Sequence, residues 1–292
     1  MGGGAWTTTA YVDHSTTTRG FNSMDAFYNA SSQELYRSHY LVDELNPLNI
    51  MRECCDSEEH PNTIPVILAL DVTGSMGKAA EAVAKQLNDI MTELYKNVKD
   101  VEFCVMAIGD LSYDDAPIQM GQFESDIRIA EQLEKVYFER GGGGNSWESY
   151  TAAWYMGLNH TKLDCWNRGK KGIIITMGDE PLNPYLPMRG LSAATGDNLQ
   201  GDVDTKDLYR EVCEKFDVYH IGIDDRETCF SRYESRIKET FGELLGQNYM
   251  KSTCQNLYKT IADIVEASVT YKKNNNKTTE IHINESDGGI SW

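Results

Sequence analysis

The sequence has few basic residues, few cysteines and no long apolar run. Its 292 residues include 27 Lys and Arg against 45 Asp and Glu, a net charge of −18. This balance excludes the basic surface that nucleic acids or anionic lipids require, so we expect neither a nucleic-acid nor a membrane partner. No apolar run approaches the roughly 18 residues that a membrane-spanning helix needs.

Cysteine usage and the first residues exclude further classes. Seven cysteines are scattered along the chain and none form a CxxC pair, which excludes a disulfide scaffold and a zinc ribbon. The opening MGGGAWTTT has neither the basic nor the apolar part of a secretory signal peptide. Trp6 stands where the N-myristoylation pattern requires Ser or Thr. We therefore expect a cytoplasmic protein in which Cys54 and Cys55 are free thiols.

Four apolar runs of strand length follow the polar first 60 residues. Their continuous apolar character is typical of strands buried on both faces of a parallel sheet. Amphipathic helical patterns lie between them, and this alternation predicts a doubly wound α/β fold. We expect a mostly parallel, six-stranded, Rossmann-like sheet flanked by helices, with a short edge strand at Pro117–Phe123. The four runs are Ile64–Leu70, Val101–Ile108, Gly172–Met177 and Val218–Ile223.

The helical patterns and the flanking segments define the expected domain organisation. Residues 1–60 form an N-terminal extension with one helical stretch at Ser23–Leu45, residues 61–272 form the α/β domain, and residues 273–292 form a tail. Within the tail, TTEIHI (278–283) can pair as a strand. Further helices are expected after Gly77, where apolar residues recur at helical spacing, and at Ser125–Val136, Trp147–Asn159, Thr205–Lys215, Arg226–Leu245 and Cys254–Tyr271.

Oxygen-bearing side chains follow three of the predicted strands. Binding sites of open α/β sheets form beyond the carboxyl ends of the strands. Asp71, Thr73 and Ser75 follow the first run and Asp179 follows the third, while Asn145 comes directly after four glycines. These hard oxygen donors are ligands for Mg²⁺, Mn²⁺ or Ca²⁺ rather than for zinc. Because few of them are charged, a bound ion would stay electrophilic and open to an outside ligand.

These residues carry a resemblance to a known family. From about Pro65 to Tyr271 the chain resembles a von Willebrand factor type A (vWA) domain. Asp71-Val72-Thr73-Gly74-Ser75 resembles its D-x-S/T-x-S metal-ion-dependent adhesion site (MIDAS). Gly141–Gly144 with Asn145 resembles the second loop, where a Thr or Asp usually stands, and Gly178-Asp179 resembles the third. The run Gly109–Asp126 resembles the region before the glycine loop in bacterial intracellular members.

The resemblance implies a Mg²⁺-dependent protein-binding module. In the family, a carboxylate of the partner often completes the coordination of the ion. Bacterial intracellular members often work beside AAA-type ATPases or in stress and phage-linked operons, so we expect a protein partner of such a kind. The implied ligands are Asp71, Thr73 and Ser75 directly, Asn145 or one of its neighbours Ser146, Glu148 and Ser149, and Asp179 directly or through water, with Asp110 as an outer-shell acid.

Other readings of the same residues remain open at this point. Asp71, Thr73 and Ser75 are all good helix-capping residues, and Glu148 has the spacing of a capping-box acid. Ser75 opens a helix after a strand, like the nucleophile of a serine hydrolase, with Asp179 and His220 in the matching order. Asp71 is placed like the nucleophile of a metal-dependent phosphatase or phosphotransferase. We expect a binding protein rather than an enzyme.

Overall fold

A six-stranded sheet forms the centre of the molecule. The computed structural model describes residues 4–138 and 146–283, with side chains up to residue 270. The strand order is β10-β9-β6-β2-β3-β4, and every pairing is parallel except that of β3 with β4. The predicted mostly parallel, six-stranded α/β fold is thereby confirmed. The strands are β2 (Ile64–Asp71), β3 (Val101–Ile108), β4 (Ile118–Glu124), β6 (Gly172–Gly178), β9 (Phe216–Ile223) and β10 (Tyr249–Ser252).

The continuous apolar runs supply two hydrophobic cores, one on each face of the sheet. Successive side chains of a strand point to opposite faces. Leu68 and Leu70 therefore belong to one core cluster, while Ile67 and Ala69 of the same strand belong to the other. All eight residues of β3 are buried. Burial on both faces explains why these strands lack the alternation of an exposed sheet.

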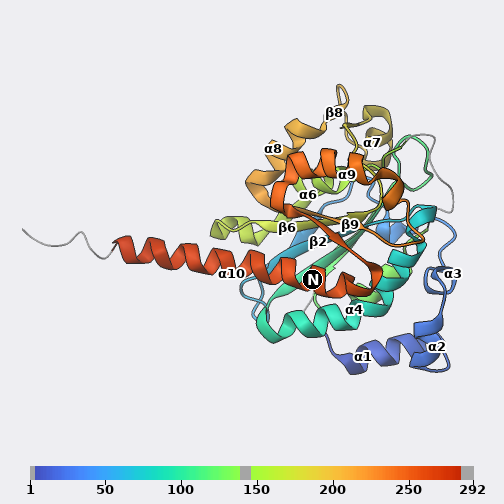
Figure 1. Ribbon diagram of the computed structural model, residues 1–292. Helices are drawn as coiled ribbons and strands as arrows, with labels where there is room; N and C mark the ends of the chain where they lie inside the picture. Colours follow the sequence, from blue (N-terminus) through green and yellow to red (C-terminus); the bar gives the residue numbers. More distant parts are fainter. Residues whose placement is uncertain (1–3, 139–145, 284–292) are drawn as a thin grey trace, which may run out of the picture.

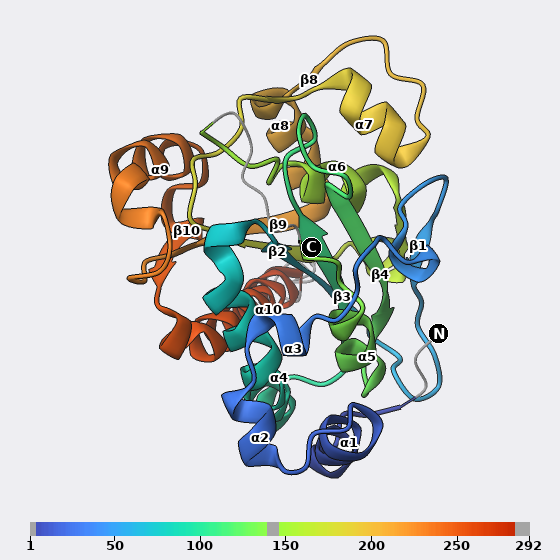
Figure 2. The same cartoon turned by 90° about the vertical axis from the view of Figure 1, so that its right-hand side faces the viewer.

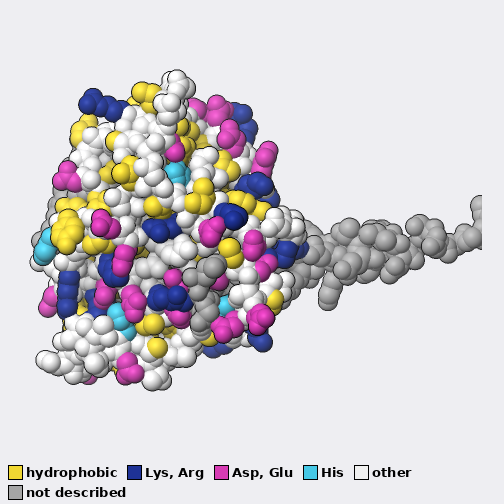
Figure 3. Space-filling model, turned by 180° about the vertical axis from the view of Figure 1, so that it is seen from behind, with side chains coloured by type: hydrophobic (Ala, Val, Ile, Leu, Met, Phe, Trp, Pro, Cys, Tyr) yellow, Lys and Arg dark blue, Asp and Glu magenta, His cyan; other side chains and the backbone are white. Residues whose placement is uncertain are grey.

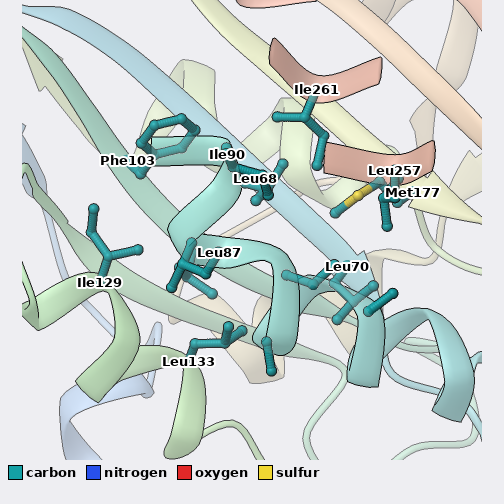
Figure 4. Packing of buried hydrophobic residues seen from close by; sticks show 14 of the residues in the cluster. Leu68, Leu70, Leu87, Ile90, Phe103, Ile129, Leu133, Met177, Leu257 and Ile261 are labelled. Atoms are coloured by element: carbon teal, nitrogen blue, oxygen red, sulfur yellow. The ribbon is translucent and has the colours of Figure 1, made fainter. Parts of the chain in front are cut away.

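Helices cover both faces of the sheet, with α4 and α10 on one side and α6 and α8 on the other (Figures 1 and 2). Figure 4 shows Leu87 and Ile90 of α4, Leu68 of β2 and Ile261 of α10 in one apolar cluster. The helices of the first layer are α4 (Gly77–Asn97), α5 (Arg128–Glu134) and α10 (Leu257–Ile283); those of the second are α6 (Ala152–Asn159), α7 (Met188–Thr195), α8 (Thr205–Lys215) and α9 (Phe230–Leu245).

The prediction of a single helix at Ser23–Leu45 is wrong. The segment divides into α2 (Met24–Asn29), α3 (Ser32–Leu35) and a 3-10 turn at Asp43–Leu45. Serine side chains compete with helical backbone bonds and favour helix starts. Ser23 accepts a hydrogen bond from the Ala26 amide, and Ser31 forms a capping box with Glu34. Two such starts within nine residues break one amphipathic stretch into short helices.

The N-terminal segment packs against α4. It adds α1 (Thr8–Asp13). The Tyr11 hydroxyl donates to the Ala84 carbonyl at 2.9 Å, and the Tyr36 hydroxyl donates to the Ala80 carbonyl at 2.7 Å. Further along, β1 (Arg52–Cys54) pairs in parallel with β5 (Thr161–Leu163). The extension is thus packed along the α/β body at several points.

The prediction of a strand at TTEIHI (278–283) is also wrong. This segment lies in α10, which continues from Leu257 to Ile283 across the expected boundary between residues 272 and 273. The chain from Leu257 to Ile283 contains no Gly or Pro that would stop the helix. The far half of α10 projects away from the body (Figure 1).

The surface carries charges of both signs. Lys and Arg side chains are interspersed with Asp and Glu over the face that Figure 3 shows. Among the helices of the described part of the chain, none is both long and apolar enough to cross a membrane.

An ion pair joins the N-terminal segment to α5. Arg19 Nε lies 3.0 Å from Glu134 Oε2, and His14 Nε2 lies 3.3 Å from the same oxygen. Burial by itself raises the pKa of Glu134, but the His14 contact and the Arg19 charge outweigh it and hold the pKa below its ordinary value. The carboxylate is therefore stabilised in its charged form in the folded protein.

We expect Glu134→Gln to lower the free energy of unfolding at pH 7 by about 1–3 kcal/mol, because it removes the anionic partner of the buried Arg19 and His14 side chains. Because the folded-state pKa is lowered, this stabilisation is present at neutral pH and is lost as the pH falls below about 4. Urea unfolding of both proteins from pH 7 to pH 3 measures the difference, which should shrink on acidification. Glu131→Gln on the same helix, where no ion pair of Glu131 is present among the described residues, is the matched control.

Candidate metal centre

Two buried carboxylates lie at the carboxyl ends of adjacent parallel strands. Asp71 is the last residue of β2, and Asp179 follows β6 directly. The two strands are paired up to Leu70 and Met177, so their ends meet at one edge of the sheet. Both aspartates are 0% exposed. The structure thereby brings together the first and third loops that the sequence singles out.

The first loop turns back onto Asp71. Asp71 Oδ1 accepts hydrogen bonds from the Thr73 amide at 2.9 Å and from the Thr73 hydroxyl at 2.6 Å. An Asp that bonds the backbone two residues ahead forms a local turn. The helix-capping reading is wrong, since neither the 3-10 turn at Gly74–Met76 nor α4 has a side-chain cap. The Thr73 amide and hydroxyl bond the Asp71 carboxylate instead.

The third loop is tied to α9 and to the first loop. Asp179 Oδ2 accepts a hydrogen bond from the Cys229 amide at 2.5 Å, at the start of α9. The Ser75 side chain opposes the burial-driven rise in the pKa of Asp179, which places it close to this carboxylate. The second carboxylate oxygen, Oδ1, is buried and has no hydrogen-bond partner in the described structure. An orphaned carboxylate oxygen in the interior is costly unless something positive satisfies it.

The second loop is described only in part. Asn145, the expected ligand there, lies outside the described residues. Ser149 Oγ accepts a hydrogen bond from the Leu111 amide at 3.1 Å. Glu148 is 3% exposed, and its Oε2 has no hydrogen-bond partner among the described residues. The capping-box reading of Glu148 is wrong, because α6 begins at Ala152 with Thr151 as its N-cap rather than near residue 147.

The site concentrates negative charge. Burial together with the charge of Asp179 raises the pKa of Asp71 to about 8. Burial and the neighbouring carboxylates, Asp71 first among them, raise the pKa of Glu148 to about 11. Burial and Asp179 raise the pKa of Glu180 to about 7, although Arg232 and Arg236 oppose that rise. A divalent cation would supply the positive charge that these groups lack, so the residues present fit one.

The donor set is mixed. Within residues 4–138 and 146–270, no group of three or more His, Cys, Asp or Glu side chains has metal-binding geometry. The predicted ligand set contains two carboxylates, Asp71 and Asp179, and otherwise consists of hydroxyl and amide oxygens. Asp110, the expected outer-shell acid, is 2% exposed, and its Oδ1 accepts from the Ser112 amide at 2.7 Å.

Tyr150 is a site residue that the sequence analysis missed. Its hydroxyl donates to Asp71 Oδ2 at 2.8 Å and accepts from the Glu180 amide at 3.3 Å. A Cβ atom on Gly178 would lie 2.0 Å from this hydroxyl, so only glycine permits the approach. Tyr150 therefore links all three loops. In the sequence it follows no motif and looks like any core aromatic residue, so no signal identified it.

The structure does not assemble the hydrolase relay considered for Ser75. His220 lies inside β9 with its ring stacked on Phe241 at a centroid distance of 3.5 Å. Its Nδ1 lies 2.9 Å from Thr176 Oγ1, and its Nε2 has no hydrogen-bond partner in the described chain. Burial lowers its pKa, which keeps the ring neutral. Both oxygens of Asp71 accept hydrogen bonds, Oδ1 from Thr73 and Oδ2 from the Tyr150 hydroxyl.

Comparison with known proteins yields only distant likenesses. No protein-family model matches the chain, and no curated protein matches it. The fold is similar to the pilus adhesin SpaC from Lactobacillus rhamnosus GG, at 13% identity over 71% of this chain and 31% of SpaC, with a TM-score of 0.44. The chain thus spans about a third of the SpaC chain.

Two further solved structures are similar. The conserved hypothetical protein BatB from Bacteroides thetaiotaomicron shares 15% identity over 71% of this chain and 99% of its own, with a TM-score of 0.43. The proximal thread matrix protein 1 from the mussel byssus shares 14% identity over 73% of this chain and 49% of its own, with a TM-score of 0.44. The observed six-stranded, mostly parallel sheet is compatible with a vWA-like arrangement.

Loss of the Tyr150 hydroxyl removes one of the hydrogen bonds that hold the buried Asp71 carboxylate. We expect Tyr150→Phe to lower the free energy of unfolding in EDTA by about 1–3 kcal/mol. Urea unfolding followed by circular dichroism measures this change. Tyr113→Phe is the control, because Tyr113 is 58% exposed. Loss of its hydroxyl should leave the free energy of unfolding unchanged. An unchanged unfolding free energy for Tyr150→Phe contradicts the assigned bond.

Proposed function

We propose that the chain is a metal-dependent protein-binding module of the vWA type, with a MIDAS-like site at the carboxyl ends of β2 and β6. The observation that carries this proposal is the pair of fully buried carboxylates, Asp71 and Asp179. Within the described residues neither forms an ion pair with a basic side chain, and Asp179 Oδ1 has no hydrogen-bond partner. Charges are buried in proteins when they are paired or when they coordinate a metal. A bound cation gives this arrangement a physical reason.

The residues that would hold the ion come from three loops. Asp71, Thr73 and Ser75 would contribute from the first loop and Asp179 from the third, with Asn145 as the expected second-loop ligand. Mg²⁺ is the ion we propose, and Mn²⁺ and Ca²⁺ share its preference for oxygen. The ion would supply positive charge and a coordination position for an outside ligand. Tyr150 would hold the Asp71 carboxylate in place, as outer-shell partners of metal ligands do.

The proposed ligand of the ion is a carboxylate of a partner protein. An AAA-type ATPase or another protein encoded in the same operon is the kind of partner that the resemblance implies, and the cytoplasm of a bacterium is the setting. A protein ligand is consistent with the acidic chain, because a net charge of −18 disfavours nucleic acid and anionic lipid.

We expect EDTA-stripped protein to bind one Mg²⁺, measured by isothermal titration calorimetry and by urea unfolding. At about 100 times the dissociation constant, the ion should stabilise the fold by about 2.7 kcal/mol. Asp71→Asn should abolish this gain, because it removes a charge from the site while keeping the shape of the side chain.

Two serine variants test the assignment of the ligands. Ser75→Ala should weaken Mg²⁺ binding at least tenfold, whereas Ser231→Ala on the exposed surface of α9 should leave it unchanged. The proposal is wrong if wild-type protein binds neither Mg²⁺, Mn²⁺ nor Ca²⁺. It is also wrong if Asp71→Asn binds these ions as well as wild type does.

A further inference from the structure

Two arginines of α9 lie beside the third loop of the site. Arg232 and Arg236 are one helical turn apart, so they project from the same face of the helix. Both are exposed. They act electrostatically on Glu180, the residue that follows Asp179. The sequence analysis assigned them no role.

Two hydrogen bonds fix the position of these arginines relative to the site. The Cys229 amide, at the start of α9, donates to Asp179 Oδ2 at 2.5 Å. About three turns later, the Thr240 hydroxyl accepts from the Leu182 amide at 3.2 Å. The third loop therefore runs along the first turns of α9. Arg232 and Arg236 share a stripe with Thr240, since positions four apart lie on one face.

The arginines carry positive charge that the described chain does not neutralise with an ion pair. No Asp or Glu oxygen within residues 4–138 and 146–270 forms an ion pair with either guanidinium. Arg232 has its guanidinium 5.1 Å from the ring centre of Tyr233. It also stands in the first turn of α9, which contains no acidic residue. The helix dipole disfavours a cation at a helix N-terminus. The stability of α9 therefore gives no reason for an arginine at position 232.

We propose that Arg232 and Arg236 bind further carboxylates of the partner, so that the module takes an acidic peptide segment rather than a single acidic side chain. This inference rests on the proposed function, in which a first carboxylate of the same segment binds the ion. The guanidinium group matches a carboxylate with two parallel hydrogen bonds, which favours Arg over Lys at such a position.

The spacing along the helix suits an extended peptide. Arg232 and Arg236 are separated by about 6 Å along the axis of α9. Alternate residues of an extended strand are separated by about 6.6 Å and point to the same side. A segment with acidic residues at every second position could therefore meet the ion and then the arginines in turn. The arginine pair also relieves the repulsion that a partner of this kind meets from a chain of net charge −18.

The test uses a fluorescein-labelled hexaglutamate peptide as the probe and fluorescence polarisation as the readout. We expect saturable binding to wild-type protein in Mg²⁺, at least tenfold weaker binding in EDTA, and no binding of hexaglutamine. Arg232→Ala combined with Arg236→Ala should weaken hexaglutamate binding at least tenfold. Lys238→Ala, which removes one positive charge from another side of α9, should change it less than twofold.

A parallel Mg²⁺ titration of each variant separates this inference from the proposed function. The double arginine variant should bind Mg²⁺ as wild type does. If wild type binds no ion, the proposed function fails. If the ion binds but hexaglutamate does not, or if peptide binding survives either EDTA or the double substitution, the inference alone is overturned. A loss as large in Lys238→Ala as in the double variant overturns it too, because the effect is then one of overall charge.

Discussion

The burial of two carboxylates side by side, Asp71 and Asp179, is the constraint on which the rest of the site depends. Parallel strands end at a common edge, so the residues that terminate β2 and follow β6 are forced together. Two like charges at such a place raise each other's pKa and cost free energy. The Thr73 hydroxyl, the Tyr150 hydroxyl and the Cys229 amide all donate to these oxygens. Asp179 Oδ1 still lacks a donor in the part of the chain that the structure describes.

Charge is arranged around this edge in two zones. Carboxylates lie inside, where burial and mutual repulsion hold their pKa values high, as for Glu148. Exposed guanidinium groups, Arg232 and Arg236, lie outside along α9. An ion at the inner zone and arginines at the outer one would both attract acidic groups, although the chain as a whole is strongly acidic. Local charge dominates over net charge at contact distances, since salt screens beyond about 8 Å.

Helices and strands with a clear apolar pattern could be predicted from the sequence. Those whose form depends on side-chain caps or on pairing with a neighbouring strand could not. Val101–Ile108 is a strand with the bounds expected of it, and Thr205–Lys215 is a helix over the expected residues, because each has a continuous apolar run or a clear stripe. The helix at Ser23–Leu45 failed because serine caps outweighed its periodicity. The edge strand β10 was missed, since its four residues have little apolar pattern and are held in place by β9.

The sequence by itself determined the α/β alternation, the sheet of buried strands and the order of the three loops, because apolar periodicity and turn residues are local properties of the chain. Only the tertiary structure decided that Tyr150 bonds Asp71, that Glu148 is buried with its Oε2 unpartnered among the described residues, and that α9 brings two arginines to the third loop. Those contacts join residues tens of positions apart. They follow from how the strands are ordered and the helices packed, which no local pattern encodes.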